Sequence, residues 1–328
     1  MLQSLINIFL SYGFWIALIT IATPLLIAAS GELVVEKSGV LNLGMEGMML
    51  IGAVVAFAVT YATGGNYLFG ILAAMLAAAL SSLLFGYLTI TLAANQVATG
   101  LALTIFGLSF SALVGEDFVG KTVKSVQPLF DIAIDKQASG GEQFMTGMMQ
   151  LFFGHTLYVY FAFALLAAVH FFLFHTRQGL ILRAVGESDS SAHSIGYSVA
   201  GVRFAAVCFG GAMAGIAGSF FSLVLTPMWA EEMTGGRGWI ALALVVFSSW
   251  KPVRLLIGAL LFGFVLALEL YVKAAGITLF APEFLAALPY LATIAVLALI
   301  SILQTKGSSV APFVCRIEIK PKTAMVAK

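Results

Sequence analysis

The chain contains the uncharged stretch GMMLIGAVVAFAVTYATGGNYLFGILAAMLAAALSSLLFGYLTITLAANQVATGLALTIFGLSFSALVG, residues 47–115, in which 69 consecutive positions lack Asp, Glu, Lys, Arg and His. A soluble domain needs charge over most of its surface. The hydrocarbon core of a bilayer is about 30 Å thick, and a helix of roughly 20 apolar residues crosses it. The stretch therefore predicts three membrane-spanning helices, separated by polar turns at 63–66 and 93–96.

The rest of the chain has the same composition. Hydrophobic residues make up 61% of it and charged residues 9%, whereas a soluble domain carries about 25% charged residues. Membrane spans must be helices or a closed barrel, because unpaired backbone groups are costly in lipid. The apolar runs are continuous rather than alternating, which argues against a barrel. We expect an all-α, polytopic membrane protein with 8–10 transmembrane helices. Residues 1–305 would form one transmembrane domain and 306–328 a basic cytoplasmic tail.

The basic residues indicate the orientation. They cluster at 177–203, at 251–254 and in the tail, and such clusters mark the cytoplasmic side. Loops 116–142, 227–237 and 273–285 are then external, and 238–250 and 286–305 are expected to be returning spans. Two arrangements remain open upstream. If Glu32–Ser38 is a cytoplasmic loop, the chain starts outside; if that segment re-enters the membrane, it starts inside. Residues 1–31 contain no basic residue, which favours a retained first helix over a secretory signal.

Signatures of catalysis are weak. Residues 115–122, GEDFVGKT, match the phosphate-binding pattern G-x-x-x-x-G-K-[ST], but such a loop needs a preceding strand and a following helix. Here an expected membrane helix precedes it, and two acids within it would repel phosphate. Cys208 and Cys315 have no metal-ligand spacing, and neither H-E-x-x-H nor G-x-S-x-G occurs. We expect no catalytic residue, no metal, no cofactor bound by this chain, and no nucleic-acid partner.

A glycine-broken polar segment, Gly39–Gly47, directly precedes an apolar run and contains Asn42 and Glu46. Irregular backbone at membrane depth is tolerated where it is buried in protein or lines a cavity, and it marks substrate pathways. Acids within spans are functional candidates as well, and Glu46 and Glu269 qualify. The competing interpretations are a simple helix cap at Asn42 and a purely structural role for each acid, which is favoured for Glu269.

Two further segments have features of a transporter. Gly211 and Gly215 are four residues apart, and so are Ala214 and Gly218. This spacing of small residues allows close helix packing. The cytoplasmic segment 182–199 reads as a short surface helix that Asp189 can cap and Gly196 can end. Such a helix is suited to docking on another protein, although it could equally be a plain connector.

Several short motifs in a fixed order resemble the permease subunits of bacterial ABC importers, in the branched-chain amino acid and simple sugar superfamily. Within it, the chain resembles the nucleoside permeases of the guanosine or purine type. The motifs are GE at 31–32, EKSGV at 36–40, NLGMEG at 42–47, LRAVGE at 182–187, GRGWIALA at 236–243 and LPYL at 288–291.

The resemblance implies a type II importer-like fold in a bacterial plasma membrane. It also implies a cytoplasmic ATPase that binds ATP-Mg, a second permease in a homo- or heterodimer, and an external substrate-binding lipoprotein. The positions that would contact the ATPase are Arg183, Gly186, Glu187, Ala192, His193 and Gly196. Family segments often carry an Ala-Ala pair followed by a basic residue, whereas this chain has Ser191-Ala192 and His193.

The expected substrate is a neutral small molecule, because the spans contain almost no cation to compensate an anion. Amide and hydroxyl groups suit a sugar or nucleoside, and the candidate pathway residues are Glu32, Asn42, Glu46, Asn95, Gln96 and Thr99. The resemblance favours a purine nucleoside; a simple sugar or a branched-chain amino acid is the alternative. A secondary transporter or channel is a different class, and it would need ion-coupling acids or an inverted repeat.

Overall fold

The computed structural model describes residues 8–130 and 140–276 and the single positions 291, 294 and 298. The regular elements within these ranges are helical, and strand pairing there is limited to an isolated bridge between Thr122 and Met228. The elements are α2 (Tyr12–Lys37), α3 (Met45–Ala62), α4 (Tyr67–Gly86), η1 (Tyr87–Thr91), α5 (Gln96–Gly115), η2 (Glu116–Phe118), α6 (Gly140–Phe153), α7 (Leu157–His175), α8 (Arg177–Glu187), α9 (Asp189–Ser194), α10 (Val199–Phe220), η3 (Phe221–Leu225), α11 (Arg237–Phe247) and α12 (Pro252–Ala274).

Seven of the described helices are long and apolar enough to cross a membrane: α2, α3, α4 with η1, α5 with η2, α7, α10 with η3, and α12. The three helices expected in 47–115 are confirmed as α3, α4 and α5. The expected span at 238–250 is wrong in length, because α11 has 11 residues and reaches only about 16 Å at 1.5 Å per residue. The basic tail and, apart from positions 291, 294 and 298, the expected span at 286–305 lie outside the described residues.

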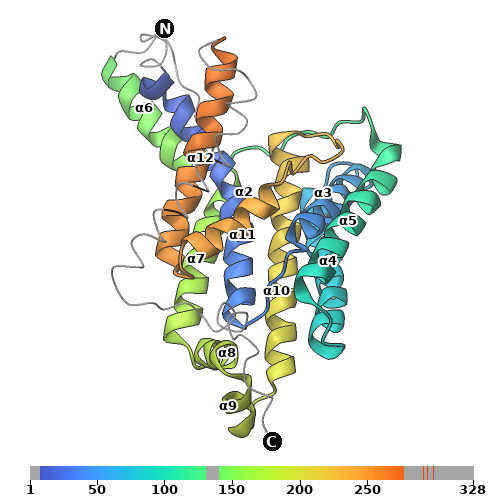
Figure 1. Cartoon of the computed structure of the whole chain (residues 1–328). Helices are drawn as coiled ribbons and strands as arrows, with labels where there is room; N and C mark the ends of the chain where they lie inside the picture. The colour runs from blue at the N-terminus through green and yellow to red at the C-terminus, as the bar shows by residue number, and fades with distance from the viewer. Residues whose placement is uncertain (1–7, 131–139, 277–290, 292–293, 295–297, 299–328) are drawn as a thin grey trace, which may run out of the picture.

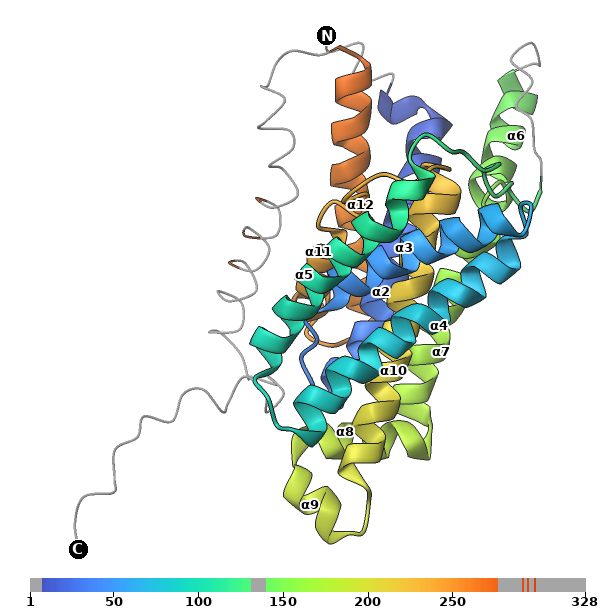
Figure 2. The same ribbon diagram turned by 90° about the vertical axis from the view of Figure 1, so that its right-hand side faces the viewer.

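Helices α2 and α10 form the centre of the molecule. Figure 1 shows α7 and α12 on one side of this pair and α3, α4 and α5 on the other. In the view of Figure 2, α3, α4 and α5 lie side by side and cross the central helices at an incline. Most residues of α2, α3 and α10 are buried, whereas most residues of α4, α5 and α7 are at least partly exposed. The first three therefore form the packed core, and the others present the surface suited to lipid.

Glycines let α10 approach its neighbours closely. A β-carbon at Gly211 would lie 2.8 Å from the carbonyl oxygen of Ala78 in α4, and one at Gly215 would lie 2.3 Å from that of Ala74. A β-carbon at Gly218 would lie 2.0 Å from the carbonyl oxygen of Met49 in α3. Contacts this short exclude any side chain, so these positions set the distance between α10 and both helices.

The two ends of the molecule differ. Helices α8 and α9 lie at one end, and the loops after α5 and after η3 lie at the other (Figure 1). These loops pair, since the backbone N–H of Val123 donates to the carbonyl of Pro227 at 3.0 Å. Helix α2 begins beside the end of α12, with the Phe14 and Tyr271 rings 5.6 Å apart, and ends near α8. The expectation of a loop at Glu32–Ser38 is wrong, because residues 32–37 are the last turns of α2.

Candidate functional site

The break between α2 and α3, residues 38–44, is held by polar side chains from other parts of the chain. The N–H of Leu41 donates to Gln96 Oε1 at 2.8 Å, and the N–H of Asn42 donates to Glu32 Oε1 at 3.1 Å. Asn42 Oδ1 in turn accepts the N–H of Gly44 at 3.0 Å. The side chains that the sequence singled out therefore satisfy backbone groups that an interrupted helix leaves without partners.

The candidate pathway residues fall into two groups. Glu32, Asn42 and Gln96 meet at the break, where Glu32 and Asn42 have no exposed surface. Asn95 and Thr99 do not join them. Asn95 is exposed and caps α5 by accepting the N–H of Ala98 at 3.0 Å. Thr99 lines an apolar cavity of about 390 Å³ between α4 and α5, together with Leu84, Phe85, Leu88, Ala98, Ala102, Leu103 and Phe106.

Glu46 joins the start of α3 to the start of α11. Its carboxylate accepts the hydroxyl of Thr234 at 2.5 Å and the backbone N–H groups of Gly236 at 2.9 Å and Gly238 at 2.5 Å. Glu46 is 5% exposed. Helix N-termini carry partial positive charge and unpaired N–H groups, so one carboxylate compensates two converging helix ends. Sequence reasoning missed Thr234 and Gly236, although the glycine-rich string before a short helix was a usable signal.

Two buried acids lie one turn apart on α2. Glu36 Oε2 accepts the indole N–H of Trp250 at 2.5 Å, a contact that sequence reasoning missed. The other carboxylate oxygen of Glu36, and Oε2 of Glu32, have no hydrogen-bond partner among the described residues. The turn between α11 and α12 is thus tied to the C-terminal end of α2, close to the break.

The segment 182–199, expected to be cytoplasmic, lies in α8, the short helix α9 and the start of α10. The expected cap at Asp189 is wrong: Ser188 is the cap, and its Oγ accepts the N–H of Ser191 at 3.3 Å. Asp189 is the first helical residue, and its carboxylate turns to Arg203 instead. Gly196 follows the helix end with φ of +92°, a conformation that favours glycine.

The candidate ATPase contacts also divide into two groups. Ala192 is 2% exposed and Gly186 touches the end of α2, while the guanidinium of Arg183 lies over the Phe174 ring, 5.1 Å from its centre. These three residues therefore face their own chain. Glu187, His193 and Gly196 are exposed. Sequence reasoning missed Ile195, which follows α9 and is 74% exposed.

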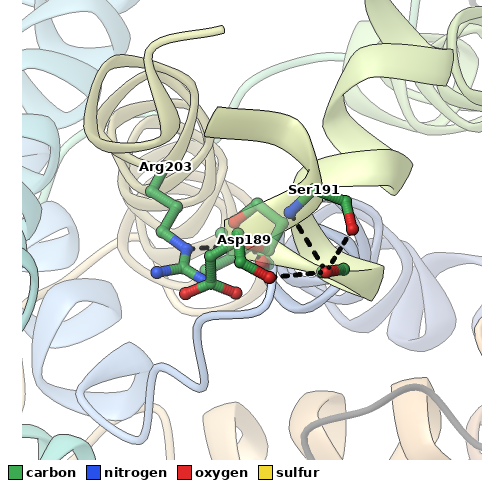
Figure 3. Close-up of polar contacts among 7 residues, drawn as sticks. Asp189, Ser191 and Arg203 are labelled. Carbon is green, nitrogen blue, oxygen red and sulfur yellow. Dashed lines mark hydrogen bonds and ion pairs between the residues drawn. The ribbon is translucent and has the colours of Figure 1, made fainter. Parts of the chain in front are cut away.

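Arg203, near the start of α10, connects α9 to the break. Its Nη2 lies 3.1 Å from Asp189 Oδ2, and its Nε donates to the carbonyl of Ser38 at 3.2 Å. Figure 3 shows the guanidinium beside the Asp189 carboxylate, with Ser191 in the capping contacts of α9.

Together, a helical bundle, two helices that begin inside it and a short surface helix at one end are typical of a multi-pass transport subunit. Residues 14–299 match the family described as "Branched-chain amino acid transport system / permease component", and the chain belongs to this family. It is an ABC transporter permease subunit of the plasma membrane.

Three relatives cover most of the chain. The putative glucose ABC transporter permease protein TsgC13 of Haloferax volcanii is 38% identical over 86% of this chain and 89% of its own. The guanosine ABC transporter permease protein NupQ of Bacillus subtilis is 32% identical over 77% and 81%. The nucleoside ABC transporter permease protein NupC of Lactococcus lactis is 28% identical over 89% and 91%.

Proposed function

We propose that this chain is the membrane subunit of an ATP-driven importer for a neutral hydroxylated solute, and that this solute is a purine nucleoside. The observation that carries the neutral substrate is the position of Glu46. Helix N-termini within a bundle can hold the carboxylate of an amino acid substrate. Here the N-terminus of α11 already holds the carboxylate of Glu46, which lies in the first turn of α3, so a substrate anion would meet a site that is already compensated.

The charge of the spanning helices supports the same conclusion. The lysines and arginines of the described spans, Lys37, Arg203, Arg254 and Lys273, each lie near a helix end. An uncompensated anion deeper in the bundle would cost several kcal/mol. A nucleoside or a sugar carries no such charge and is bound through hydroxyl and amide groups.

The relatives support a nucleoside as substrate, because two of them are named guanosine and nucleoside permeases. A simple sugar is the second candidate. It is favoured by the glucose permease, which is the more similar of the three at 38% identity. Both solutes are neutral and rich in hydroxyl groups, so the neutral character of the pathway does not distinguish them.

The same proposal assigns the partners. A separate ATPase binds ATP-Mg and docks on the exposed side of α9, where Glu187, His193, Ile195 and Gly196 lie. An external lipoprotein delivers the substrate, and a second permease completes the pathway. Transport is then a shift between inward- and outward-facing states that nucleotide on the ATPase biases.

The test is uptake of radiolabelled guanosine, glucose and leucine into vesicles that hold the full complex, with and without internal ATP. Guanosine uptake that requires ATP is the expected result. Glucose uptake without guanosine uptake would replace the nucleoside with the sugar. Leucine uptake alone would overturn the neutral substrate, and accumulation without ATP would overturn the energy source.

A further inference from the structure

We propose that Arg203 is a positioning residue that links the docking helix α9 to the break between α2 and α3, so that a displacement of α9 reaches the network of Glu32 and Asn42. This inference rests on the proposed function, since it assumes that α9 meets an ATPase. It adds a specific connection through which that contact acts on the buried part of the permease.

The guanidinium makes two contacts at once. Nη2 pairs with Asp189 Oδ2 at 3.1 Å, while Nε donates to the carbonyl of Ser38 at 3.2 Å. The guanidinium is planar and rigid, and its donors point in fixed directions. A shift of α9 that keeps the ion pair therefore moves the guanidinium, and with it the hydrogen bond to Ser38. Figure 3 shows that the pair lies where α9 faces the start of α10.

The exposure of the pair indicates what it does. The side chains of Arg203 and Asp189 are 20% and 58% exposed, and ion pairs with this much solvent contribute only about 0–1 kcal/mol to stability. The ion pair between α9 and α10 therefore contributes little to stability. The relative position of α9 and the break is the property that the contact controls.

Close packing at two glycines also joins α8, the end of α2 and Arg203. A β-carbon at Gly186 in α8 would lie 2.1 Å from the carbonyl oxygen of Lys37, and one at Gly39 would lie 3.2 Å from Arg203 Nη2 and 3.3 Å from Gly186 Cα. The end of α2 is therefore held between the backbone of α8 and the guanidinium of Arg203. The spacing leaves no room for a side chain at Gly186 between α8 and the end of α2.

The path from Ser38 to the buried network is short and hydrogen-bonded. The N–H of Gly39 donates to the carbonyl of Glu36, and that of Val40 donates to the carbonyl of Val35. The N–H of Asn42 then meets the carboxylate of Glu32. Movement at Ser38 thus reaches Asn42 through backbone that is bonded at nearly every step.

The test uses the full complex of permease, ATPase and binding protein in vesicles, and measures substrate uptake per ATP hydrolysed. In Arg203→Lys, the ammonium keeps its charge beside Asp189 but cannot hold both partners in the guanidinium geometry. We expect uptake per ATP to fall at least about fivefold, the lower end of typical coupling between sites. The control is Arg177→Gln, which removes an exposed arginine of α8 and is expected to match the wild type.

Three further measurements make the result decisive. Copurification with the ATPase separates loss of docking from loss of coupling, and the melting temperature reports any loss of folding. Asp189→Asn combined with Arg203→Lys should be no worse than Arg203→Lys alone, because both changes break one link. Wild-type uptake per ATP in Arg203→Lys, or additive losses in the double variant, would overturn the inference. Absence of ATP-driven uptake in the wild type would instead overturn the proposed function.

Discussion

The carboxylate of Glu46, in the first turn of α3, accepts the backbone N–H of Gly238, in the first turn of α11, across 192 residues of sequence. The same carboxylate also accepts hydrogen bonds from the N–H of Gly236 and the hydroxyl of Thr234. Two helices therefore start at one point inside the bundle and share one acid. This arrangement explains how a glutamate is accommodated among apolar spans, since every bond it makes is to a helix start or to the turn before it.

Replacing Glu46 with Gln should lower stability, because the amide NH₂ would face at least one backbone donor. Hydrogen bonds to charged groups contribute about 1.5–3 kcal/mol, and we expect Glu46→Gln to lose a similar free energy of unfolding. Thermal denaturation of the purified permease in detergent measures the loss. The matched control is Glu269→Gln, because Glu269 pairs with the exposed Lys273 at 2.7 Å. Equal losses in the two variants would contradict the shared-acid arrangement.

Gly218→Ala should separate α10 from α3, because the added methyl would lie 2.0 Å from the carbonyl oxygen of Met49. Inserting a methyl group into a packed interior costs about 1–3 kcal/mol. In the same helix, Gly201→Ala would meet only the Ser198 side chain, at 3.1 Å, and should be neutral or slightly stabilising. The yield of folded protein and the melting temperature compare the two. A Gly218→Ala variant as stable as Gly201→Ala would show that the helices have room to spare.

Much of the fold could be predicted from the sequence because it depends on local composition. The absence of charge over 47–115 requires helical spans whatever surrounds them, and the polar turns mark their ends. The length of α11 could not be predicted this way. Residues 238–250 are as apolar as a span, and only the contact between Glu46 and Gly238 shows that the helix starts inside the bundle.

The candidate site was predicted only in part, because a local residue pattern does not show which distant side chains bond to it. The glycines and polar residues around Asn42 marked the break, but pattern alone did not show that Gln96 and Glu32 bond its backbone. Ala192 shows why the contact residues of α9 could not be predicted from the sequence. A small apolar residue in a short helix fits either face, and burial by its own chain decides the matter. Ile195 was overlooked because an isolated aliphatic residue after a helix has no distinctive pattern.

The burial of Asn42 makes a prediction about its accessibility. A cysteine at 42, in a background with Cys208 and Cys315 replaced by serine, should resist small water-soluble thiol reagents in the conformation described here, because Asn42 has no exposed surface. If the break lines the pathway in another state, nucleotide or substrate should raise the rate. A cysteine at the exposed Asn95 is the control and should react in every state. Rapid labelling at 42 in all states would contradict the burial, and inertness in all states would exclude Asn42 from the pathway.

The exposed end of α9 leads to a prediction about docking. Ile195 is a large apolar side chain that is 74% exposed, and such residues act as anchors when a partner covers them. Ile195→Asp should weaken binding to the ATPase at least about tenfold, which corresponds to ~1.4 kcal/mol, and should leave the melting temperature of the isolated permease unchanged. Ile195→Leu keeps the apolar surface and serves as the control. Ala192→Asp should behave differently, because it places a charge at a position that the permease itself buries. It should lower the melting temperature before any partner is added. Binding that is measured with the purified ATPase distinguishes these cases, and wild-type affinity in Ile195→Asp would exclude this end of α9 from the interface.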